Sequence, residues 1–149
     1  MNELLHNWQV LWIPATVLII SQCIKLVVEW KRGEGFHVEH LNSYGGMPST
    51  HTALFTSVTL MVGIVHGFAT PLFALAIFTA AAIIRDAVGI RYALGTHGKL
   101  LNHLIDLLPE ERQKEFPDNI NERLGHTYTE AFAGFILGIV LTLILVALI

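Results

Sequence analysis

Four long apolar runs separated by polar segments constrain the fold of this chain more than any other feature. They cover Leu4–Val28, Thr52–Val65, Pro71–Leu94 and Thr127–Ile149. A helix needs about 20 mainly apolar residues to cross a bilayer. Only 14% of the residues are charged, against about 25% in soluble domains. The pattern predicts an all-α integral membrane protein, a bundle of about four transmembrane helices that forms one domain over residues 1–149.

The segments around these runs predict where helices begin, pack and end. Thr52–Val65 is short for a full crossing unless its helix begins near Pro48. The polar stretch Gly95–Gly125 is expected to be a loop that contains an amphipathic segment on the membrane surface. Apolar residues recur there at helical spacing, at Leu100, Leu101, Leu104, Ile105 and Leu108. Gly134 and Gly138 form a G-x-x-x-G pattern that favours close helix packing.

If all four runs cross the membrane, several polar residues at their ends lie on the same side. The end of the first, the start of the second, the end of the third and the start of the fourth emerge together. This brings five residues to one surface: Lys25, Arg32, His51, Arg91 and His126. All nine Lys and Arg residues lie at these ends or in the loops of this side. Short loops rich in Lys and Arg stay inside, so we expect this surface to face the cytoplasm, at the plasma membrane if the source is bacterial.

The block from Gly45 to His51 (Gly-Gly-Met-Pro-Ser-Thr-His) is the first candidate for chemistry. Its glycines allow a sharp turn, and Ser49 or Thr50 can cap a helix that starts there. Free N–H groups at a helix start suit an anion such as phosphate. His51, in the first turn, can exchange a proton near neutral pH. The alternative is a plain helix start with an incidental histidine.

A second candidate lies at the start of the last run, where Leu124-Gly125-His126-Thr127-Tyr128-Thr129-Glu130 opens a helix. His126 and Glu130 are four residues apart, so a helix that includes both would put them on one face. A carboxylate on one ring nitrogen of His126 leaves the other nitrogen free to attack. Thr127-x-x-Glu130 also has the form of a capping box, so Glu130 has a purely structural alternative.

Charged residues beside the apolar runs are the third group of candidates. Lys25 and Arg32 flank the end of the first run. They can bind phosphate oxygens, or they can be cations that extend to the interface. Arg85, Asp86 and Arg91 lie in the last part of the third run. Ionisable residues at that depth are candidates for function, and a neutralised Arg85–Asp86 pair is the structural alternative.

Together these blocks resemble motifs of the type 2 phosphatidic acid phosphatase and vanadium haloperoxidase superfamily. The closest similarity is to its divergent branch, the acid phosphatase/haloperoxidase-related membrane proteins, over nearly the whole chain. The shared blocks are Gly-Gly-Met-Pro-Ser-x-His, ending at His51, Asp86-Ala87-x-Gly89-x-Arg91 and Leu124-Gly125-His126-Thr127-x-x-Glu130.

The resemblance implies a role for each block. His126 would be the nucleophile that forms a phosphohistidine, Glu130 would orient it, and His51 would protonate the leaving alcohol. The phosphate-binding residues would be Lys25, Arg32, Ser49, Thr50 and Arg91. Arg91 is the candidate for an arginine that the superfamily places ahead of its last histidine, and Arg123 is the rival. Asp86 would support the site, and the resemblance implies no metal and no other cofactor.

The expected substrate is a lipid-linked phosphate monoester or diphosphate whose tail stays among the membrane lipids. No basic stripe with interleaved aromatics indicates nucleic acid. Related proteins usually have six membrane helices, so a homodimer is one way for four to complete the cavity. Two alternatives remain open. One is a non-catalytic membrane protein with the same fold. The other is a metal-dependent lipid phosphotransferase with four ligands, Asp86, His97, His103 and Asp106.

Overall fold

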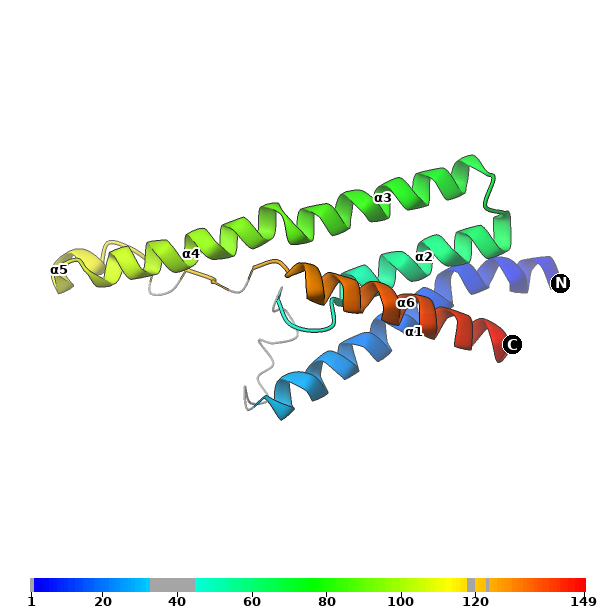
Figure 1. Cartoon of the computed structure of the whole chain (residues 1–149), viewed down its shortest axis with the longest axis horizontal. Helices are drawn as coiled ribbons and strands as arrows, with labels where there is room; N and C mark the ends of the chain where they lie inside the picture. The colour runs from blue at the N-terminus through cyan, green and yellow to red at the C-terminus, as the bar shows by residue number, and fades with distance from the viewer. Residues whose placement is uncertain (1, 33–44, 118–119, 123) are drawn as a thin grey trace.

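The computed structural model describes residues 2–32, 45–117, 120–122 and 124–149, with side chains from Trp8 onward in the first helix. The regular elements in this part of the chain are all helices (Figure 1). Their bounds are α1 Asn2–Lys31, α2 Thr50–His66, α3 Pro71–Val88, α4 Ile90–Asp106, α5 Glu110–Gln113 and α6 Tyr128–Ala147. The predicted all-α fold is therefore confirmed.

Three helical stretches are long and apolar enough to cross a membrane. They are Trp8–Lys31, Pro71–Asp106 and Tyr128–Ala147. The second α-helix, Thr50–His66, is a shorter apolar helix of 17 residues. At 1.5 Å per residue it is about 26 Å long, close to the 30 Å hydrocarbon thickness of a bilayer. The four apolar runs of the sequence therefore all form helices.

The centre of the bundle is α2, which packs against α1, α3 and α6. Its contact with α1 forms a core that includes Ile13, Val17 and Met61, all fully buried. Its contact with α6 depends on two glycines. A methyl group on Gly138 would lie 2.6 Å from the carbonyl oxygen of Ala53, and one on Gly134 would overlap the main chain at Ser49. The close packing predicted from the G-x-x-x-G pattern is confirmed.

The arm formed by α3 and α4 corrects one prediction. We expected Gly95–Gly125 to be a loop, but helix continues to Asp106, so the amphipathic segment belongs to a long helical arm that extends past the bundle (Figure 1). Gly89 alone separates α3 from α4. The amide of Ala93 donates a 2.9 Å hydrogen bond to the carbonyl oxygen of Gly89, as in a continuous helix. The position of this segment on a membrane surface stays a prediction.

The glycines of α4 show why a loop predicted from Gly95 onward is a helix in the structure. Glycine lowers helix propensity by about 1 kcal/mol relative to alanine. In α4, however, Gly95 and Gly98 allow another segment to pack closely. A methyl group on either residue would lie 2.7 Å from a main-chain oxygen, that of Glu122 or that of Asn121 respectively. Tertiary contact therefore outweighs the local preference.

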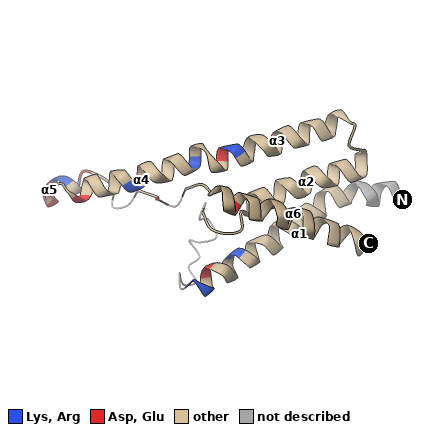
Figure 2. Cartoon of the chain, viewed as in Figure 1, with Lys and Arg blue, Asp and Glu red and all other residues tan. Residues whose placement is uncertain are grey.

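Charge is unevenly distributed along the bundle. Figure 2 shows the described Lys, Arg, Asp and Glu residues towards the end that holds α4, α5 and the end of α1. The chain termini and the turn between α2 and α3 lie at the opposite end (Figure 1). This arrangement agrees with the one-sided grouping predicted from four spans. Which end faces the cytoplasm stays a prediction.

Candidate active site

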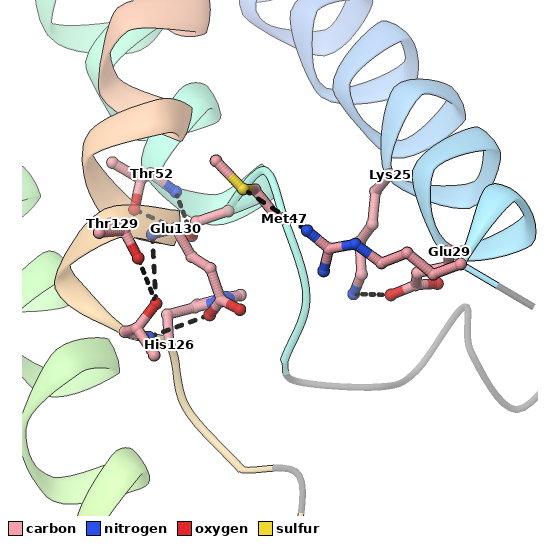
Figure 3. A network of polar contacts seen from close by, with 10 residues as sticks. Lys25, Glu29, Met47, Thr52, His126, Thr129 and Glu130 are labelled. Atoms are coloured by element: carbon pink, nitrogen blue, oxygen red, sulfur yellow. Dashed lines mark hydrogen bonds and ion pairs between the residues drawn. The ribbon is translucent and has the colours of Figure 1, made fainter. Parts of the chain in front are cut away.

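The start of α6 places His126 and Glu130 side by side. Thr127 is the N-cap: its hydroxyl accepts the amide of Glu130 at 3.3 Å, and its own amide donates to Glu130 Oε2 at 2.9 Å. His126 Nδ1 lies 3.4 Å from the same oxygen, Oε2 (Figure 3). The capping box is therefore present, and the carboxylate that completes it also faces the imidazole.

His126 is buried at 5% exposure immediately before the N-cap of α6. Its main-chain amide donates a 2.9 Å hydrogen bond to the carbonyl oxygen of Ala87 on α3. Nδ1 has no partner with full hydrogen-bond geometry in the described part of the chain, so its 3.4 Å approach to Glu130 Oε2 is a close polar contact. The ring is thus fixed through the main chain on one side and faces a carboxylate on the other.

A small pocket beside His126 brings the two candidate histidines together. It has a volume of about 30 Å³ and is lined by His51, Ile83, Ala87, Arg91 and His126. That volume holds about two water molecules. His51 lies in the first turn of α2 and Arg91 in the first turn of α4. Three segments far apart in the sequence therefore meet at one point, as the predicted topology requires.

Asp86 forms its ion pair with Arg91, six residues beyond the expected partner Arg85. The Nε atom of Arg91 lies 2.6 Å from Asp86 Oδ2 across the junction of α3 and α4. Asp86 is therefore placed to orient a residue that lines the pocket. The neutralised Arg85–Asp86 pair that we considered is not the arrangement found.

Ser49 and Thr50 are buried and line neither of the two pockets described here. The hydroxyl of Ser49 accepts hydrogen bonds from the amide and the hydroxyl of Thr52, at 3.4 and 2.9 Å. The predicted capping role of Ser49 is therefore confirmed. Phosphate binding by either side chain stays a prediction.

Lys25 and Glu29 form an ion pair on α1. Only Lys25 was named as a candidate from the sequence. Lys25 is 2% exposed, and its Nζ lies 3.8 Å from Glu29 Oε1. Gly46, at φ +100°, packs onto this pair, and a methyl group there would lie 3.0 Å from Lys25 Cε. Glu29 was missed, although its spacing of four residues from Lys25 is the usual sign of a helical ion pair.

A larger pocket has Glu130 in its lining. Its volume is about 310 Å³, and it is lined by Glu29, Arg32, Gly45, Gly46, Tyr92, Lys99, Glu122, Leu124, Gly125, Thr127 and Glu130. His126 lines the small pocket and Glu130 the large one. The predicted cations are thus divided: Arg91 belongs to the small pocket and Arg32 to the large one.

The segment that carries His126 into the site runs along α4. We call residues 120–122 and 124–127 the strap. The side-chain amide of Asn102 holds it through both main-chain groups of Ile120: Nδ2 donates to the carbonyl oxygen at 2.9 Å, and Oδ1 accepts the amide at 3.0 Å. Gly125, at φ +80°, packs onto the main chain at Tyr92. Arg123, the rival of Arg91, lies outside the described residues.

The alternative metal site is not assembled in the described part of the chain. No group of three or more His, Cys, Asp or Glu residues that could hold a metal occurs there. Asp86, His97, His103 and Asp106, the ligands considered for it, all belong to the described residues. A metal-dependent phosphotransferase therefore has no support from the geometry of these four side chains.

Comparisons with known proteins bear on the family. The profile of the Divergent PAP2 family matches residues 6–141. The chain is also 33% identical over 153 residues to the uncharacterized membrane protein YuiD of Bacillus subtilis (strain 168), with 96% of each chain covered. No solved structure matches. The resemblance drawn from the sequence blocks is confirmed, and the chain is a membrane protein that belongs to the Divergent PAP2 family.

Proposed function

We propose that the chain is a membrane phosphatase that hydrolyses a lipid-linked phosphate monoester or diphosphate through a phosphohistidine on His126. One observation supports this proposal above the others. His126 and His51 line one pocket together with Arg91, and the carboxylate of Glu130 lies 3.4 Å from His126 Nδ1. A nucleophile, a proton donor and a cation are the groups that phosphoryl transfer without a bound metal needs.

The first half of the reaction uses the difference between the two histidines. Glu130 holds the proton of His126 on Nδ1, which leaves the lone pair of Nε2 available. Nε2 attacks phosphorus, the P–N bond forms, and the bond from phosphorus to the lipid oxygen breaks. His51 gives its proton to that oxygen, so the lipid leaves as an alcohol. Glu130 stabilises the positive charge that develops on the ring of His126.

The second half returns the enzyme to its starting state. Water attacks phosphorus, His51 takes up a proton from that water, and the P–N bond breaks. Inorganic phosphate leaves, and His126 regains its lone pair. Arg91, oriented by Asp86 at 2.6 Å, stabilises the charge on the equatorial oxygens in both steps.

The position of the pocket along the bundle suits a lipid substrate. His51 lies at the start of the apolar helix α2, and His126 directly precedes the apolar helix α6. Ile90 and Phe132, close in sequence to Arg91 and Glu130, are 67% and 65% exposed. Such apolar side chains can contact an acyl or prenyl tail while the phosphate reaches the polar end.

The decisive test of activity is phosphate release by the purified protein in detergent micelles. The substrates are phosphatidic acid, a prenyl phosphate and a prenyl diphosphate, each with and without EDTA and orthovanadate. We expect release that EDTA leaves unchanged and vanadate, a phosphoryl-transfer analogue, inhibits. The matched control is His66→Ala, an exposed histidine at the other end of α2, and it should retain activity.

Two outcomes would contradict the proposal. No turnover of any lipid by a folded protein would favour a non-catalytic member of the family. Loss of activity in EDTA would favour the metal-dependent alternative.

A further inference from the structure

One face of α4 is apolar and exposed. Another side of the same helix packs against the strap through Gly95, Gly98 and Asn102. The apolar face carries five large side chains that are between 37% and 67% exposed: Ile90, Leu94, Leu101, Leu104 and Leu108. A contiguous apolar surface of this kind is typical of a place where another molecule packs.

The residues of this face follow a heptad pattern. Along α4 and just beyond it, the spacing alternates between four and three residues at Ile90, Leu94, His97, Leu101, Leu104 and Leu108. We call these six residues the seam. Such alternation keeps one line of side chains directed at a partner helix, as in a two-stranded coiled coil. Lys99 and Asp106, the charged residues of α4 after Arg91, lie on the side of the helix away from the seam.

The length of the arm limits how much of the seam a bilayer can cover. The helix α3 has 18 residues and is about 27 Å long, close to the hydrocarbon thickness of about 30 Å. Helix α4 continues from it past the bundle (Figure 1). Leu101 and Leu104 follow Val88, the last residue of α3, by about 20 and 24 Å along the axis. A straight arm therefore carries these leucines into the aqueous phase.

The strap holds the arm straight across Gly89. On the α3 side of this glycine, the amide of His126 donates to the carbonyl oxygen of Ala87 at 2.9 Å. On the α4 side, Asn102 holds the main chain of Ile120 at 2.9 and 3.0 Å. A bend that laid α4 on the membrane surface, as expected from the sequence, would disturb these attachments. The structure thus favours a protein partner over lipid for the seam.

We propose that the seam pairs with the seam of a second copy, so that two α4 helices form a parallel coiled coil outside the membrane. A self-complementary apolar surface is what a two-fold symmetric dimer needs. Both copies cross the membrane in the same direction, so the two-fold axis lies along the membrane normal and the helices run parallel. The seam residues line neither pocket described above. Pairing therefore leaves the candidate site open and does not require phosphatase activity.

His97 is the one polar residue of the seam. In a parallel two-fold dimer each seam residue meets its own counterpart, so His97 faces His97 of the partner subunit. A single polar residue in an apolar seam selects the register in which the two polar groups meet, at a cost in stability. Replacement by leucine should therefore strengthen the association.

Cysteine cross-linking in isolated membranes tests the face and the register. In a Cys23→Ser background, Leu101→Cys and His103→Cys each place one thiol at an exposed position of α4, within the seam and outside it respectively. Mild oxidation should join two copies through Leu101→Cys and leave His103→Cys monomeric. Absence of a cross-link at Leu101→Cys, the result expected if α4 lies on the membrane surface, would overturn the proposal. So would cross-linking at His103→Cys alone.

Light scattering by the full-length protein in detergent, over a range of concentrations, measures the association. Leu104 is 50% exposed, and Leu104→Glu places two carboxylates in the seam, so the dimer dissociation constant should rise at least about a hundredfold. His103→Glu adds the same charge outside the seam and should match wild type. His97→Leu should lower the constant about tenfold. Thermal melts check that each variant folds.

Two results would contradict the pairing. One is a wild type that stays monomeric at every concentration, and the other is a folded Leu104→Glu that dimerises as wild type does. Neither depends on turnover, so the outcome is separate from that of the phosphatase assays.

Discussion

The main-chain amide of Ser49 donates a 3.1 Å hydrogen bond to the carbonyl oxygen of Glu130. This bond joins the residue that caps α2 to the first turn of α6. The segment that holds His51 is thereby fixed against the segment that follows His126. The separation of the two candidate histidines thus depends on the packing of α2 against α6.

The glycine contact between α6 and α2 gives the first prediction. In Gly138→Ala the added methyl group would lie 2.6 Å from the carbonyl oxygen of Ala53, so the helices must move apart. We expect a loss of about 1–3 kcal/mol of stability, although alanine is the better helix former. A thermal melt in detergent measures this loss. Val140→Leu, on the exposed face of α6, is the control. Equal melting temperatures for Gly138→Ala and wild type would contradict the packing described.

A second prediction concerns the strap. Asn102→Ala removes both hydrogen bonds to the main chain of Ile120, at 2.9 and 3.0 Å. Each is worth about 0.5–1.5 kcal/mol. We expect faster hydrogen exchange at the Ile120 amide and a kcat lower by roughly tenfold, because His126 is held less well. His103→Ala, an exposed neighbour, should leave both unchanged. Normal exchange in Asn102→Ala would show that other contacts hold the strap.

The apolar helices could be predicted because each is a long run of apolar residues with few charges. The start of α2 was also predictable, since Pro48 and Ser49 are typical helix-start residues. Helix α4 could not be predicted beyond its amphipathic segment. Its glycines disfavour helix locally, and the strap that needs them is distant in sequence. Only tertiary contact shows why Gly95 and Gly98 belong in a helix.

The grouping of the candidate site residues was predictable from the sequence, but their division between two pockets was not. Topology alone brings His51, Arg91 and His126 to one side, and the structure places all three around one pocket. The division of the cations between two pockets could not be predicted, because it depends on the path of the strap. The motif alone leaves two roles open for Ser49, as a helix cap or as a phosphate ligand. In the structure its hydroxyl accepts a hydrogen bond from the hydroxyl of Thr52.

The third prediction concerns His51 as the proton donor to the leaving group. Proton transfer of this kind is worth about 10²–10⁴-fold. We expect His51→Ala to slow hydrolysis of a lipid phosphate by that factor. An activated aryl phosphate, whose leaving group needs little protonation, should lose far less. Steady-state kinetics on both substrates make the comparison. Equal losses would indicate that His51 only positions the phosphate.

The fourth prediction concerns orientation in the membrane. The excess of Lys and Arg at the site end predicts that this end faces the cytoplasm. In a Cys23→Ser background, Glu110→Cys should react with an impermeant maleimide only after cell lysis. Ile149→Cys, at the other end, should react on intact cells. Labelling of Glu110→Cys on intact cells would reverse the orientation.

The fifth prediction concerns the buried His126 and its partner Glu130. The side chain of His126 lies before the N-cap, outside the apolar core. We therefore expect His126→Ala to abolish turnover while the protein keeps its fold, as a thermal melt can check. Glu130→Gln should reduce turnover only in part, because the amide can still contact the ring but cannot stabilise positive charge on it.

Trapping of the covalent intermediate tests the central claim most directly. Protein is mixed with ³²P-labelled lipid phosphate and quenched with base during turnover, because phosphohistidine is labile to acid. Mass spectrometry then maps the label. We predict an adduct on His126 in wild type and in His66→Ala, and none in His126→Ala. Label on a different residue, or full activity in His126→Ala, would contradict the phosphohistidine mechanism.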